Sequence, residues 1–230
     1  MSTKKPTGQI GPFKVESGTS GATGKWDTIA FPTDKRAIES IIVRQFVDGM
    51  KRAGASVLSV QPNEEADFDF TLSLPGGRVY LELREVHYRD GPGRPYDSRQ
   101  IRIESFKYAE QIVEAVHDKS GRYPPESKIP IDLLLYVTHW RFEPNEVVIR
   151  LAQHLLQTRR PIFENVFLVL PTDQNEAEVR LLYPSDNPLE GRSLDDLRDH
   201  WYLNLDPAKW KVLSEHPSGA GDPPTSPSSA

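Results

Sequence analysis

One stretch, from Asp67 to Val86, restricts the fold of this chain more than any other. It reads DFDFTLSLPGGRVYLELREV, two runs of alternating apolar and polar side chains joined by Pro-Gly-Gly. Alternation of this kind predicts two strands, and the turn residues predict that the strands pair as a hairpin. The apolar side chains then share one face of the hairpin, while Asp67, Asp69 and Glu82 lie on the other.

The periodicity of the remaining chain predicts an α/β fold. A helix is expected over 33–54, where apolar residues recur at helical spacing after Thr33 or Asp34 as N-cap and before Gly54 as stop. A second helix follows the hairpin from about Ser98, although Ile101 and Ile103 alternate as in a strand. Further strands are expected over 56–62, 131–140, 165–170 and 177–184, and further helices over 144–159 and 194–201. This order predicts a mixed central sheet with helices on its faces.

Length and composition are those of one domain. With 230 residues and 37% hydrophobic content, we expect a single core over residues 25–213. The segments 1–24 and 214–230 are rich in small and polar residues, and we expect both to be disordered. No run reaches the roughly 18 apolar residues of a membrane helix, so we expect no membrane partner. The chain has no cysteine, which excludes thiolate sites and fits a cytoplasmic protein.

The acids of the hairpin have two interpretations. Asp69 and Glu82 come close across the paired strands, and two close carboxylates require a cation between them, which points to Mg²⁺ or Mn²⁺. The alternative is an ordinary hairpin with one solvated face. Glu39 borders the apolar stripe of the first helix, where a carboxylate needs a partner. That partner is either a metal or an arginine such as Arg84.

The segment that carries these acids resembles the signature of the PD-(D/E)XK nuclease superfamily. In that signature an Asp begins one strand and a Glu-x-Lys follows across a hairpin; here twelve residues separate Asp69 from Glu82-Leu83-Arg84. The predicted order over 33–140 is similar to the restriction-endonuclease-like αβββαβ core. The resemblance covers about half of the chain, and its motif is short, so the element order counts as much as the residues.

The resemblance implies a set of metal ligands. Asp69 and Glu82 would bind the metal with the backbone carbonyl of Leu83, and Glu39 would reach it directly or through water. Asp67 is the alternative ligand, because Ala66-Asp67 stands where the family has Pro-Asp.

The chain departs from the family at Arg84, which replaces the lysine of the motif. Arginine stays protonated, so it stabilises charge but does not exchange a proton. Some family members move the basic residue to the following helix, which makes Lys107 a candidate, with Gln100 or Gln111 as polar helpers. Nucleic-acid contacts are expected at Arg84, Arg99, Arg102 and Gln100.

Together these features predict a divalent-metal-dependent nuclease acting on DNA, with Asp69, Glu82, Arg84 and Lys107 as catalytic residues. Cleavage of both strands often uses two sites, which is compatible with a homodimer. One alternative is a catalytically inactive member of the same fold that binds nucleic acid or a protein partner. A second is a non-enzymatic regulatory adaptor whose acids form a solvated face.

Overall fold

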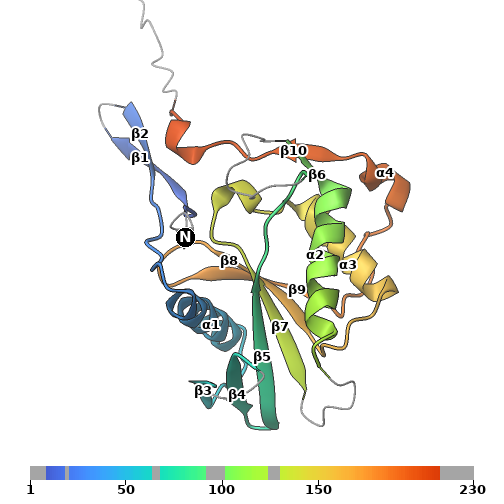
Figure 1. The fold of residues 1–230 in the computed structure, drawn as a ribbon. Helices are drawn as coiled ribbons and strands as arrows, with labels where there is room; N and C mark the ends of the chain where they lie inside the picture. Colours follow the sequence, from blue (N-terminus) through green and yellow to red (C-terminus); the bar gives the residue numbers. More distant parts are fainter. Residues whose placement is uncertain (1–8, 19–20, 64–67, 92–101, 124–129, 213–230) are drawn as a thin grey trace, which may run out of the picture.

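The computed structural model describes residues 9–18, 21–63, 68–91, 102–123 and 130–212. They form a mixed α/β fold around a six-stranded sheet, as predicted (Figure 1). In the order in which they lie, the strands are β3 (Ser59–Pro62), β4 (Phe70–Leu74), β5 (Gly77–Glu85), β7 (Ile131–Tyr136), β8 (Val166–Pro171) and β9 (Ala177–Tyr183).

The predicted hairpin is formed by β4 and β5. The strands are antiparallel, with Phe70 opposite Leu81 and Leu72 opposite Val79. Leu72 and Leu81 are fully buried, so the apolar face of the hairpin contributes to the core. The register that places Thr71 opposite Tyr80 brings the preceding turn of chain, which contains Asp69, next to the middle of β5.

The centre of the sheet is parallel and is covered on both faces. Strands β5, β7 and β8 run parallel, and all six residues of β7 are buried, as its largely apolar sequence predicted. Helix α1 (Lys35–Arg52) covers one face of the sheet (Figure 1). Helices α2 (Ser105–Ser120) and α3 (Glu146–Thr158) pack together on the other. Helix α2 is the crossover that two parallel strands require, so it runs antiparallel to β5 and β7.

Helix α1 follows the expectation from its sequence. The side chain of Asp34 accepts a 2.8 Å hydrogen bond from the backbone N–H of Ala37, which identifies Asp34 as the N-cap. Lys51 and Arg52 lie in the last turn, where they complement the helix dipole.

Among the described residues, no helix combines the length and the apolar character needed to cross a bilayer.

Two predicted segments differ from the structure. The expected disorder over 1–24 is wrong for the part that forms a hairpin of β1 (Phe13–Gly18) and β2 (Gly21–Trp26). The second helix begins at Ser105 instead of near Ser98, because β6 (Arg102–Glu104) precedes it and pairs with β10 (Trp201–Leu203). Residues 1–8 and 213–230 lie outside the described residues, so the remaining tail predictions stay predictions.

Candidate functional site

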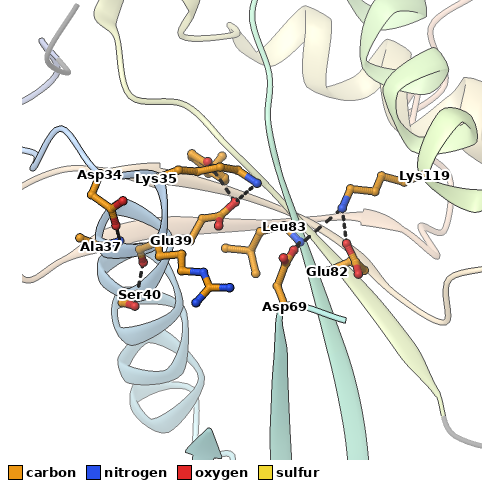
Figure 2. A network of polar contacts seen from close by, with 11 residues as sticks. Asp34, Lys35, Ala37, Glu39, Ser40, Asp69, Glu82, Leu83 and Lys119 are labelled. Atoms are coloured by element: carbon orange, nitrogen blue, oxygen red, sulfur yellow. Dashed lines mark hydrogen bonds and ion pairs between the residues drawn. The ribbon is translucent and has the colours of Figure 1, made fainter. Parts of the chain in front are cut away.

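Two carboxylates of the hairpin region converge on one ammonium group. Asp69 precedes β4, Glu82 lies in β5, and Lys119 lies in the last turn of α2 (Figure 2). The Nζ atom of Lys119 forms an ion pair with Oε2 of Glu82 and lies 3.9 Å from Oδ2 of Asp69. The same Asp69 oxygen accepts a 2.8 Å hydrogen bond from the backbone N–H of Leu83. The structure thus brings the predicted pair, Asp69 and Glu82, together around a cation.

Glu82 is buried, which contradicts the solvated-face interpretation for this residue. Its side chain is 2% exposed, and its Oε1 atom accepts a hydrogen bond from the hydroxyl of Tyr123. Burial raises the pKa of Glu82, while Lys119 and Tyr123 oppose that rise by stabilising the carboxylate. Burial and the contact with Glu82 raise the pKa of Tyr123 as well. The phenol therefore remains protonated and serves as the donor.

A stack of aromatic rings supports both sides of the pair. Phe68 immediately precedes Asp69, and its ring lies 4.2 Å from that of Tyr80, with an angle of 10° between the planes. On the other side it lies 5.0 Å from the ring of Tyr123, at 17°. The stack thus fixes the rings of Phe68 and Tyr123. Through Phe68 it positions the neighbouring Asp69, and through Tyr123 it positions the hydroxyl that contacts Glu82.

Glu39 lies on the opposite face of the sheet from Glu82. Its Oε1 atom lies 3.1 Å from Nζ of Lys35 and accepts a 3.5 Å hydrogen bond from the hydroxyl of Tyr136. Tyr136 is the register partner of Glu85 in β5, and side chains alternate faces along a strand, so Tyr136 does not share the face of Glu82. Burial raises the pKa of Glu39. The direct partners of Glu39 are thus Lys35 and Tyr136, but Asp69 and Lys119 are near enough for their charges to act on its pKa, Asp69 raising it and Lys119 lowering it.

Arg84 shares the face of Glu82 but pairs with a different acid. Its Nη2 atom lies 3.3 Å from Oδ2 of Asp118, the residue before Lys119. Arg84 and Asp118 line a cavity of about 300 Å³ between β5 and α2. The other polar side chains that line this cavity are Glu85, His87, Arg89, Gln111 and Glu114. One end of the cavity therefore lies beside the Asp69–Glu82 pair, and the cavity extends from there along α2.

The other predicted residues lie elsewhere. Lys107, in the first part of α2, pairs with Asp90 at 2.5 Å, and twelve residues of helix separate it from Lys119, about 18 Å along the axis. Arg102 lies in β6 with its guanidinium 4.5 Å from the ring of Trp201. The structure brings neither to the carboxylates. The predicted residues Arg99 and Gln100 and the alternative ligand Asp67 lie outside the described residues.

Sequence reasoning missed Lys119 and Tyr123. The residue named from the sequence in the helix after the hairpin was Lys107, whereas the lysine that the structure places beside the carboxylates is Lys119. A crossover helix runs antiparallel to the strand before it, so its last turn returns toward the first half of that strand. This rule favours Lys119 over Lys107. No comparable signal pointed to Tyr123.

The donor set fits a divalent cation in part. Carboxylate oxygens are the protein ligands that Mg²⁺ prefers, and one or two of them suffice because Mg²⁺ retains several waters. Asp69 and Glu82 provide two, and the Lys119 ammonium already occupies a cation position in contact with both. The described residues contain no group of three or more His, Asp or Glu side chains arranged to hold a metal.

Comparison with known proteins gives no family for this chain. No family profile matches the chain, and no curated protein matches its sequence. One solved structure that is similar is that of Pyrococcus furiosus SfsA in complex with Ca²⁺. The two chains are 15% identical over 75% of this chain and 76% of that one, with a TM-score of 0.28.

Proposed function

We propose that this protein is a divalent-metal-dependent nuclease that hydrolyses phosphodiester bonds in DNA, with a restriction-endonuclease-like αβββαβ core. One observation carries the proposal: Asp69 and Glu82 meet at a common cation position, at the spacing of the PD-(D/E)XK signature. Two carboxylates in contact are unfavourable without a cation. Burial of the Glu82 carboxylate also costs free energy that a solvated strand face would not require.

The residues of the cluster have separate roles in the proposed site. Asp69 and Glu82 hold Mg²⁺ or Mn²⁺, and the bound ion would polarise a phosphodiester oxygen and lower the pKa of the attacking water. The family has a lysine where this chain has Arg84, and Lys119 supplies the ammonium group in its place. Lys119 directly follows Asp118, which lines the cavity along α2, so its ammonium is close to where a phosphate in that cavity would lie.

The cavity along α2 suggests where the nucleic-acid backbone lies. Arg84 and Arg89 line it on the strand side, and both guanidinium groups match the geometry of a phosphate. Gln111 is held in place by two hydrogen bonds with the backbone of Arg89, at 2.8 and 2.6 Å. We assign phosphate binding next to the cut to Arg84 and Arg89, in place of the proton exchange that a motif lysine provides.

A plasmid-nicking assay tests the proposal. Purified wild-type protein should nick supercoiled plasmid in Mg²⁺ or Mn²⁺ and lose this activity in EDTA. Glu82→Gln should abolish nicking, whereas Glu178→Gln, on the exposed edge strand β9, should leave it unchanged. Equal nicking by wild type and Glu82→Gln would assign any activity to a contaminant and overturn the proposal.

The second candidate function is binding of nucleic acid without cleavage. The observation that favours it is the pairing of Arg84 with Asp118, which leaves the motif position without a free basic group at the carboxylates. In that case wild type and Glu82→Gln bind a DNA duplex equally and neither nicks it. Mobility shift beside the nicking assay distinguishes the two functions.

A further inference from the structure

The cation position in the proposed site is filled by the protein itself. Lys119 Nζ is paired with Glu82 Oε2 and lies 3.9 Å from Asp69 Oδ2, so it neutralises the carboxylates that would bind a metal. An ammonium in this place and a divalent ion bound directly by both carboxylates exclude each other. Electrostatic repulsion between the two cations at such distances adds to the steric conflict.

We propose that Lys119 is a tethered competitor of the metal: it occupies the carboxylate pair in the metal-free protein and leaves it when a divalent ion binds. This inference rests on the proposed function, because it assumes that Asp69 and Glu82 are metal ligands. It adds a regulatory step, since metal entry and release of the Lys119 ammonium toward solvent become one exchange.

The surroundings of Lys119 permit such an exchange. Lys119 lies in the last turn of α2, so the displaced side chain has a short path to water. Glu82 does not depend on it for position, because the Tyr123 hydroxyl holds Oε1. Asp69 is fixed by the backbone N–H of Leu83. The carboxylates therefore keep their places while the ammonium moves.

Direct metal binding tests the exchange without any measurement of cleavage. Removal of the competing charge in Lys119→Met should tighten Mn²⁺ binding by about tenfold or more in isothermal titration calorimetry. Lys51→Met is the matched control, because Lys51 lies in the last turn of α1 as Lys119 does in α2. It removes the same net charge and should leave the affinity unchanged.

A second measurement uses only the wild-type protein and guards against misfolding of the variant. Lysine acetylation followed by mass spectrometry should show slow labelling of Lys119 in EDTA and labelling several-fold faster in saturating Mg²⁺. Lys51 should be labelled at the same rate in both.

The outcomes separate the two hypotheses. Equal Mn²⁺ affinity of wild type and Lys119→Met, with Lys119 labelling unchanged by metal, overturns the exchange but leaves the nuclease proposal standing. Absence of Mn²⁺ binding in both proteins overturns the exchange and the nuclease proposal together. Tighter binding by the variant without any nicking by wild type supports the exchange in a protein that binds metal but does not cleave.

Discussion

Lys119 and Glu82 form an ion pair in which neither partner is well solvated: their side chains are 12% and 2% exposed. The two residues come from different layers of the fold, one from the last turn of α2 and the other from a central strand. A buried charge that loses its partner is far more costly than an exposed one. This pair is therefore both a structural contact and the centre of the proposed site.

Lys119→Met should destabilise the metal-free protein by about 3 kcal/mol, because it leaves the buried Glu82 carboxylate without its counterion. Urea unfolding followed by circular dichroism in EDTA measures the change. Lys14 pairs with Asp27 at the surface, where both side chains are about half exposed, so Lys14→Met should have little measurable effect. Equal effects of the two substitutions would contradict the burial argument.

Tyr123→Phe should cost about 1.5 to 3 kcal/mol, the contribution of a hydrogen bond to a charged acceptor, while it keeps the ring in its stack. Tyr123→Leu should cost more, since it also removes the contact with Phe68. The same unfolding experiment ranks the two variants. If Tyr123→Phe is as stable as wild type, the hydroxyl does not stabilise Glu82.

Arg84→Lys should change plasmid nicking by no more than a few-fold, because the Lys119 ammonium, once the metal has displaced it from the carboxylates, still lies beside the site and can contact the phosphate. Lys119→Met should lower the rate by about 100-fold or more, the usual effect of removing a group that stabilises transition-state charge. Initial rates at saturating Mg²⁺ test both. A large gain in Arg84→Lys would instead identify residue 84 as the decayed catalytic position.

Ionisation of Asp132 should lower the stability of the protein as the pH rises from 4 to 7. Burial raises its pKa from 3.8 to about 6, so the native state favours the protonated carboxyl. The resulting stabilisation is complete below about pH 4 and is lost as the pH passes through 6. Asp132→Asn keeps an Oδ1 acceptor for the backbone and side-chain N–H groups of Asn165 and does not ionise.

At pH 7 the Asp132→Asn variant should be more stable than wild type by up to about 3 kcal/mol, and the difference should vanish near pH 4. Thermal or urea unfolding at several pH values measures it, with the exposed Asp186→Asn as control. If the stability of wild type and of Asp132→Asn depends on pH in the same way across this range, ionisation of Asp132 does not cause the loss of stability.

The sequence predicted best where periodicity and burial act locally. The sequence predicted the helix that spans residues 35–52, the hairpin and the buried strand β7. Each of these elements buries one or both of its faces in the same core, so its apolar residues follow a simple pattern. The pairing of Asp69 with Glu82 was also accessible, since a tight hairpin determines which residues lie opposite one another.

What escaped prediction depends on contacts between distant segments. The β1–β2 hairpin alternates only over Phe13–Glu16, and it packs through Phe13 against Trp210, with ring centroids 5.2 Å apart. Lys119 reaches the carboxylates only because α2 returns along β5. Glu39 borders an apolar stripe as expected, but the partners that the structure gives it are Lys35 and Tyr136.

The stack of Tyr80, Phe68 and Tyr123 links the β4–β5 hairpin region to the segment that follows α2. Phe68 lies between the other two rings, so a change in the size of one ring alters the space available to the others. Positions 68, 80 and 123 should accordingly accept replacements only in compatible combinations, and related sequences should show them varying together. Shape compatibility among three hydrophobic positions would then constrain how the charged cluster evolves.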